Sequence, residues 1–220
     1  MFKEEIDYLS ARPQFNQIEM SNRAESPDQQ QRSDLKELMQ TPLLRMNMLF
    51  SFLVWSSAMF NFYLITFYLK YFPGSIFVNS IWFALSDFFS FILSGVVLKR
   101  SNNPNTTLVA SFCVSAVGGV LYLTFFRFES AVPLFIILSR VGNSMAFNTV
   151  YVANNRFFPT RFQSSTYGLA NFVSHVIAVG APMLAEASDP YPYAAFLANS
   201  CLGAVGSYFL QDISLTETRR

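Results

Sequence analysis

Charged residues are scarce in this chain, and that scarcity is the first constraint on what it can be. Lys, Arg, Asp and Glu together make up 13% of the 220 residues, against about 25% in a typical soluble domain. The formal net charge is only +1, so the sequence predicts no nucleic-acid partner, which a strongly basic surface would indicate. Apolar side chains take the place of charge and reach 52% of the residues.

Cysteine is equally sparse. The two cysteines, Cys113 and Cys201, both lie inside apolar stretches, where they behave as small apolar side chains. Their positions do not indicate a disulfide, a metal site or a redox motif. The sequence also lacks a nucleophile paired with a base and a phosphate-binding loop, so we predict that the protein is not an enzyme. We expect no cofactor and no bound metal.

What the sequence does contain is six long apolar runs. Each is close to the ~20 residues that cross the hydrocarbon core of a bilayer as a helix. They also lack the regular alternation of apolar and polar residues that a soluble domain shows. The sequence therefore predicts an all-α membrane protein with six transmembrane helices, at 46–69, 76–98, 108–126, 131–153, 167–185 and 191–210.

The chain outside these runs is polar. We divide it into a tail at 1–33, an amphipathic membrane-surface segment at 34–42, the six-span bundle at 43–212 and a short tail at 213–220. The amphipathic segment follows Ser33, a good helix-capping residue. The first 40 residues contain no apolar core of a signal peptide, and acids at positions 4, 5 and 7 argue against a mitochondrial transit peptide.

Basic residues near the ends of the runs predict the orientation, because they favour the cytoplasmic or matrix side. Eight lie on the side of the N-terminus and two on the opposite side, which predicts that both termini share the positive side. A plasma membrane and a mitochondrial inner membrane both remain open. The first group is Lys36, Arg45, Lys99, Arg100, Arg156, Arg161, Arg219 and Arg220, and the second is Lys70 and Arg127.

Three ionisable residues lie deep within the runs: Asp87, Arg140 and His175. Such residues are costly inside a bilayer, so they mark a pathway or an internal pair. Polar and small neighbours at helical spacing place each of them toward other helices. Two interpretations stay open here. The three residues line a substrate or ion pathway, or Asp87 and Arg140 form a neutral pair that holds the bundle while His175 only forms hydrogen bonds.

Several short stretches, in order and at consistent spacing, carry a resemblance. They are DLKELMQTPLLR at 34–45, RVG at 140–142, AFNTVY at 146–151, FPT at 158–160 and LTETR at 215–219. Together they resemble the C-terminal six-helix half of the organic cation transporters, within the major facilitator superfamily. The resemblance implies one half of a major-facilitator fold and a substrate-binding surface formed by Asp87, Arg140, His175, Asn148, Tyr151, Trp55 and Phe62.

The sequence departs from this family at its loops. Gly95, Arg100, Pro159 and Thr160 are remnants of the family's cytoplasmic-loop motifs, but the Asp and second Gly of the first motif are lost. Arg156 stands where the family has Glu, and Gln163 where it has Arg. The resemblance implies that these charges latch two halves together during alternating access, so their loss predicts an impaired cycle. His175 stands where cation carriers have Asp and anion carriers have Arg, so the charge of a substrate is not carried over.

Two functions therefore stay open. The altered loops, and the absence of a recognisable N-terminal half, favour a structural or accessory subunit of a larger membrane assembly that is not an autonomous transporter. The alternative is half of a major-facilitator transporter that moves small organic ions by alternating access once paired with an N-terminal half. In either case the expected partners are membrane lipid and either other membrane subunits or a complementary six-helix half.

Overall fold

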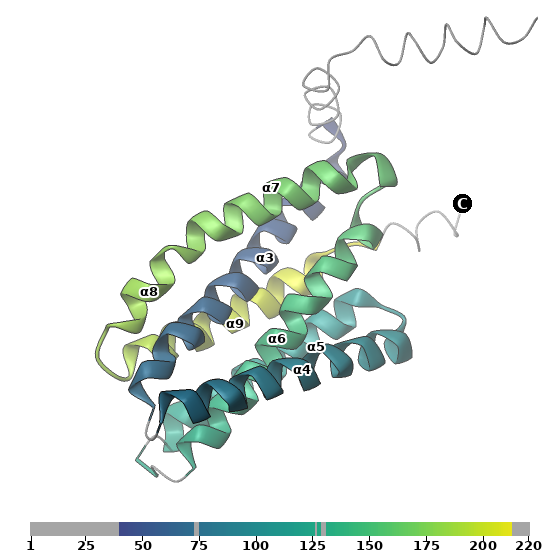
Figure 1. Ribbon diagram of the computed structural model, residues 1–220. Coiled ribbons are helices and arrows are strands. Elements are labelled where there is room, and N and C mark those ends of the chain that lie inside the picture. Colours follow the sequence, from purple (N-terminus) through teal and green to yellow (C-terminus); the bar gives the residue numbers. More distant parts are fainter. Residues whose placement is uncertain (1–39, 73–74, 126, 129–130, 213–220) are drawn as a thin grey trace, which may run out of the picture. The chain divides into compact units, whose positions relative to one another are not determined.

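The computed structural model describes residues 40–72, 75–125, 127–128 and 131–212, and within these ranges it contains helices and no strand (Figure 1). The chain separates into two units, Met1–Thr41 and Pro42–Arg220, and the helices discussed below all belong to the second. They are α3 (Pro42–Tyr68), the short 3₁₀ helix η1 (Leu69–Tyr71), α4 (Ile76–Ser101), α5 (Pro104–Phe125), α6 (Val132–Phe157), α7 (Thr160–Ala178), α8 (Gly180–Ala185) and α9 (Tyr191–Phe209). The predicted tails at 1–33 and 213–220, and most of the segment at 34–42, lie outside the described residues.

Each predicted apolar run becomes a helix, but the helices extend beyond the runs. Both α3 and α5 begin at a proline, Pro42 and Pro104. Proline suits the first position because its fixed φ is helical and its missing N–H would have no partner there. The helix α6 also continues past its apolar run to Phe157, through polar residues that a hydrophobicity pattern alone would exclude.

The fifth run forms two helices rather than one. The helix α7 ends at Ala178, and α8 begins at Gly180. Pro182 explains the interruption, since its ring collides with the carbonyl four residues earlier, that of Ala178, and it has no N–H to donate. Figure 1 shows α8 continuing along the same flank as α7, so the two together still cover the length of one span.

Four helices of the described part are long and apolar enough to cross a membrane by length and composition: 42–71, 76–101, 104–125 and 160–185. The helices α6 and α9 are not among them, so the count of six spans stays a prediction. Polar residues such as Arg140, Asn143 and Asn148 lower the hydropathy of α6. Two of these three are buried in the bundle, and Asn148 is half-buried.

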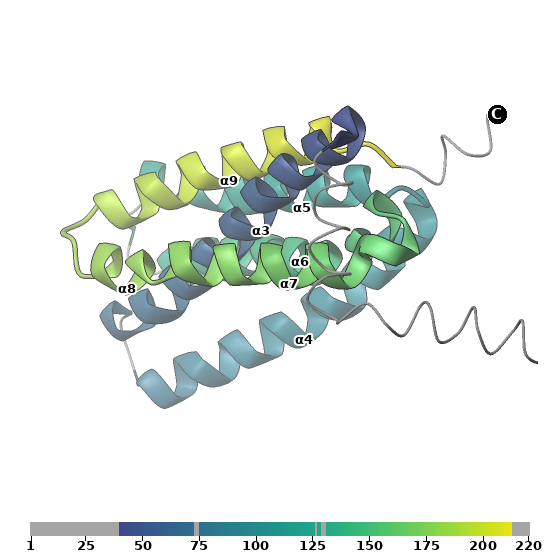
Figure 2. The ribbon, with the colours of Figure 1, turned by 90° about the horizontal axis from the view of Figure 1, so that it is seen from above.

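The helices pack in two rows. The front row runs α7, α3, α6, α4, each in contact with the next, while α9 packs behind α3 and α5 behind α6. Figure 2 shows α9 along one edge and α4 along the opposite edge. The beginning of the bundle meets its end, because the buried Asn47 side chain donates to the carbonyl of Gln211 at 2.8 Å and accepts from its N–H at 2.9 Å.

Small residues let α5 and α6 approach until their backbones touch. A Cβ placed on Gly142 would lie 2.3 Å from the backbone nitrogen of Ser115, and one on Gly118 would lie 2.5 Å from that of Ser139. Membrane helices associate through such close packing because lipid removes most of the hydrophobic driving force between them. The glycines therefore determine how closely α6 is seated against the back row.

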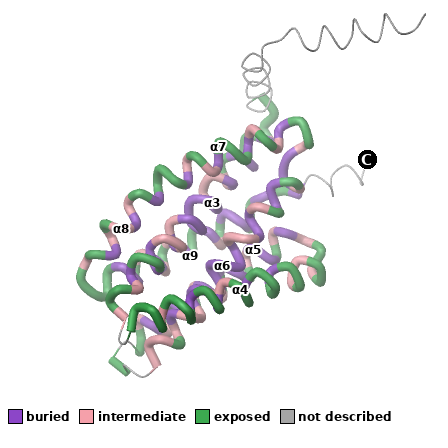
Figure 3. The backbone as a smooth tube through the Cα atoms, viewed as in Figure 1, coloured by how far each residue is buried: buried purple, intermediate pink, exposed green. Residues whose placement is uncertain are grey.

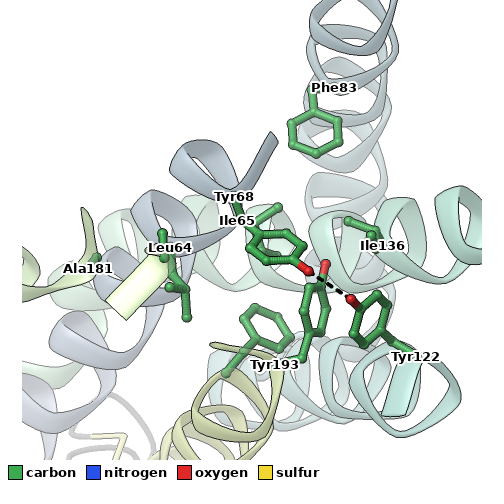
Figure 4. Packing of buried hydrophobic residues seen from close by; sticks show 10 residues of the cluster. Leu64, Ile65, Tyr68, Phe83, Tyr122, Ile136, Ala181 and Tyr193 are labelled. Carbon is green, nitrogen blue, oxygen red and sulfur yellow. Dashed lines mark hydrogen bonds between the residues drawn. The ribbon is translucent and has the colours of Figure 1, made fainter. Parts of the chain in front are cut away.

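Burial is uneven between the two rows. Figure 3 shows α3 largely buried and α4 largely exposed, in line with the long series of exposed apolar side chains on α4. The tightest apolar cluster lies at the end that holds η1 and α8, where Tyr122 stacks on Tyr193 at 3.7 Å between ring centroids (Figure 4). Tyr68 donates a hydrogen bond to Asp189 at 2.6 Å beside this cluster.

Candidate functional site

The centre of the front row is an ion pair between α4 and α6. The Arg140 guanidinium donates from Nε to Asp87 Oδ1 at 2.9 Å and from a terminal nitrogen to Oδ2 at 2.6 Å. Such two-point pairing is the strongest geometry available to Arg and a carboxylate. Ser144, one helical turn beyond Arg140, donates to the same Oδ1 at 2.5 Å. The predicted pairing of Asp87 with Arg140 is therefore confirmed.

Arg140 has further partners around it. Its remaining terminal nitrogen donates to the hydroxyl of Thr66 on α3 at 2.6 Å. The guanidinium carbon lies 4.3 Å from the centroid of the Phe62 ring and 4.8 Å from that of Phe83, positions suited to cation–π attraction. The Arg140 side chain is only 5% exposed and that of Asp87 is 18% exposed. The charge pair is thus enclosed by α3, α4 and α6 and has no net charge.

A continuous row of rings extends from this pair along α3, α6 and α7, and we call it the aromatic wall. It consists of Trp55, Phe62, Tyr63, Phe147, Tyr151 and Tyr167. Successive centroids lie between 4.6 Å (Trp55 to Tyr151) and 5.9 Å (Phe62 to Tyr63) apart. These distances fall in the range of favourable aromatic pairs. Trp55, Phe62 and Tyr151, which the resemblance placed on one surface, are therefore neighbours in space.

His175 lies at the margin of this wall rather than at its centre. Its Nδ1 lies 2.8 Å from the Asn171 carbonyl one turn earlier on α7, and its ring is 6.4 Å from that of Tyr63. The side chain is exposed, and the aromatic wall separates it from the Asp87–Arg140 pair. The three ionisable residues are therefore one pair and one separate histidine.

Asn148 extends the contact between α4 and α6. Its amide donates to the Ser94 hydroxyl at 2.6 Å. Together with Arg140 and Ser144 it forms a stripe at four-residue spacing on α6 that faces α4. This orientation is the one expected from the polar stripe in the sequence. It also shows Asn148 bonded within the bundle, as Asp87 and Arg140 are.

The loop remnants lie apart from this centre. Gly95 and Arg100 are exposed on the last turns of α4, and Pro159 and Thr160 begin α7. Arg156, which reverses the family's charge, donates to the Asn102 carbonyl at 2.9 Å and lies 4.0 Å from the buried Asp212 carboxylate. It thereby connects the ends of α6 and α4 to the segment that follows α9.

The sequence reasoning missed two sets of polar residues. Thr66 received no role, although it lies one helical turn after Phe62 and so on the same face of α3. The second set joins α3 to α9: Asn61 donates to the Ser200 hydroxyl at 2.9 Å, and Asn199 donates to Asn61 at 2.9 Å. The asparagines inside apolar runs were a signal for this network, since a buried amide needs partners.

Long apolar helices that enclose their ionisable groups define a polytopic membrane protein. Residues 13–182 match the Major Facilitator Superfamily, so the chain belongs to this superfamily. Its members are transporters, which supports the prediction that the chain is not an enzyme. A comparison with curated proteins finds no match. The narrower resemblance to the organic cation transporters stays a prediction, as do the substrate-binding role of the named residues, the organelle and the orientation of the termini.

Proposed function

We propose that this chain is a transporter-derived bundle that serves as a structural or accessory subunit of a larger membrane assembly. The observation that carries the proposal is the closed Asp87–Arg140 pair. Both carboxylate oxygens of Asp87 accept hydrogen bonds within the bundle, and Arg140 bonds to Thr66 as well. An acid that couples transport to an ion must exchange partners, whereas this arrangement stabilises a single packing of three helices.

Arg156 supports the same proposal from the end of the bundle. The resemblance implies a charge there that reaches across to a second half. In this chain Arg156 bonds to Asn102 and lies near Asp212, both in its own bundle. The interactions at this end therefore connect helices within one bundle, and they suit a part that moves as a unit.

The test compares assembly with transport in the same two proteins. The wild-type chain and Asp87→Asn are expressed in cells, extracted in mild detergent and separated by size, and co-migrating proteins are identified. We expect the wild type to migrate with other membrane subunits and Asp87→Asn to lose most of that association. Removing the carboxylate leaves Arg140 buried without its counter-charge, which loosens the packing of α4. Asn148→Ala, which removes a neutral hydrogen bond between the same helices, is the matched control and should keep the association.

The second candidate is half of an organic-ion transporter, and the aromatic wall favours it because such rings are suitable contacts for organic solutes. Vesicles containing the purified chain, alone or with a co-purified six-helix partner, would then take up an organic ion. Saturable uptake that Asp87→Asn abolishes would contradict the accessory role and establish the transporter half. Unchanged background flux in both proteins, together with lost association in the variant, is the result that we expect.

A further inference from the structure

The aromatic wall has unused hydrogen-bonding groups among its rings. The hydroxyls of Tyr63, Tyr151 and Tyr167 form no hydrogen bond to any residue that the structure describes. The Tyr151 hydroxyl lies within electrostatic range of the other two, so the three converge on one region between α3, α6 and α7. A partly buried hydroxyl without a partner is unfavourable, and a bound molecule with acceptor atoms removes that penalty.

The rings around these hydroxyls are partly accessible. Phe62, Tyr63, Phe147 and Tyr151 are half-buried and Tyr167 is exposed, while Trp55 beneath them is 3% exposed. Ring faces that already stack at 4.6 to 5.9 Å can accept a further planar ring in the same manner. The chemistry of this surface is therefore aromatic and hydrogen-bonding.

The charge at this surface decides which kind of molecule it fits. The nearest carboxylate, Asp87, is neutralised by Arg140, and Arg140 itself covers one face of Phe62. No other carboxylate lies among the wall residues, and the position that could supply one on α7 holds His175. A cation would therefore leave water without gaining a counter-charge, which is unfavourable even over aromatic rings.

We propose that the aromatic wall binds a neutral, planar aromatic molecule with acceptor atoms, and not an organic cation. This site goes beyond the proposed function, because a subunit that moves no solute can still bind a ligand. Binding would place the ligand ring against Tyr151 and Tyr167 and its acceptor near their hydroxyls. The inference fails or holds independently of assembly and uptake, since it is tested by binding alone.

The chain has two tryptophans, Trp55 in the wall and Trp82 on the exposed side of α4, and this makes a direct test possible. In Trp82→Phe, fluorescence reports on the wall alone. Three quenchers with one ring and different charge are titrated: 4-nitrobenzyl alcohol, 4-nitrobenzyltrimethylammonium and 4-nitrobenzoate. We expect saturable quenching by the neutral alcohol, with apparent affinity at least tenfold higher than that of either ion.

Two variants in the same background locate the binding. Tyr151→Leu should weaken the alcohol at least tenfold, and Tyr208→Leu, on the outer surface of α9, should leave it unchanged. If Tyr151→Leu does not fold, Tyr167→Leu replaces it, with a several-fold loss expected because that ring is more exposed. The reverse reporter, Trp55→Phe with Trp82 intact, measures partition of the probes into detergent.

Three outcomes would overturn the proposal. Equal or tighter binding of the ammonium probe would mean that the wall selects cations despite the closed charge pair. Quenching of Trp55 that does not saturate, or that matches the quenching of Trp82, would mean that the probes only partition into detergent or that other helices fill the wall. Loss of binding in neither tyrosine variant would place the ligand elsewhere.

Discussion

The helix α6 is held on its two sides by different physics. On its back, Gly142 and Ser139 touch the backbone of α5, so the contact depends on shape and tolerates no added atom. On its front, Arg140 and Ser144 bind Asp87 of α4 through charge-assisted hydrogen bonds. Residues 140 and 142 lie about 200° apart around a helix with 3.6 residues per turn. A single helix thus joins a close-packed contact to an electrostatic one.

This difference matters for what each contact can do. A backbone contact between small residues has one geometry, and any side chain added there pushes the helices apart. A buried charge pair retains a strong dependence on both of its partners, so removing one is far worse than removing both. The α5–α6 contact therefore provides a fixed base, while the α4–α6 contact determines which helix packs in front and at which register.

The largest effect is expected from breaking the charge pair on one side only. Arg140→Met leaves the Asp87 carboxylate, 18% exposed, without its counter-charge, and should lower the free energy of unfolding by about 3 kcal/mol. The double variant Asp87→Leu with Arg140→Met removes both charges and should recover more than half of that loss. Reversible unfolding in mixed detergent, followed by circular dichroism, measures all three proteins. A loss below about 1 kcal/mol in the single variant would mean that the pair does not hold α4 to α6.

The shape contact should give a smaller loss that no second substitution on α4 corrects. Gly142→Ala puts a methyl group 2.3 Å from the Ser115 backbone nitrogen, and the displaced helices should cost about 1–3 kcal/mol of unfolding free energy. Gly168→Ala on α7 is the control, because its new methyl would meet nothing within 4 Å. That variant should be neutral or gain up to about 1 kcal/mol, since alanine favours helix over glycine. Equal stabilities for the two variants would contradict the close approach of α5 and α6.

The smallest effect is expected where the same charge chemistry is exposed. Lys70 donates a hydrogen bond to Glu186, as does Tyr71 at 2.5 Å. The hydrogen bond from Lys70, and then that from Tyr71, hold the pKa of the Glu186 carboxyl below its usual value. A lowered pKa in the folded state means that the stabilisation is present above the unfolded pKa and is lost as pH falls through the folded one.

The melting temperatures of the wild type and Glu186→Gln test this exposed pair. Near pH 7 and low salt we expect the wild type to melt only slightly higher, because exposed ion pairs contribute little. The difference should shrink as pH falls below the model-peptide Glu value of about 4.3, and also in about 1 M salt, which screens exposed charges. A difference that survives both conditions would show that the pair acts through packing rather than charge.

The helices themselves were predictable because each depends on a single stretch of sequence. Apolar runs such as 76–98 and 108–126 became α4 and α5 with boundaries shifted by a few residues. The exception was the run at 167–185, where Pro182 interrupts the helix at Val179 and α8 follows as a separate element. Proline in an apolar run is a visible signal, so this break was within reach of the sequence.

The composition of this chain by itself determined that its helices are apolar enough for a membrane and that Asp87 and Arg140 must find partners away from lipid. Both conclusions follow from transfer energies of individual side chains, which need no knowledge of neighbours. Only the tertiary structure decided that these two bind each other, 53 residues apart, that Thr66 and Ser144 complete the pair, and that Arg156 bonds within its own bundle. Those choices depend on which helix faces meet, and a sequence read one segment at a time does not contain that information.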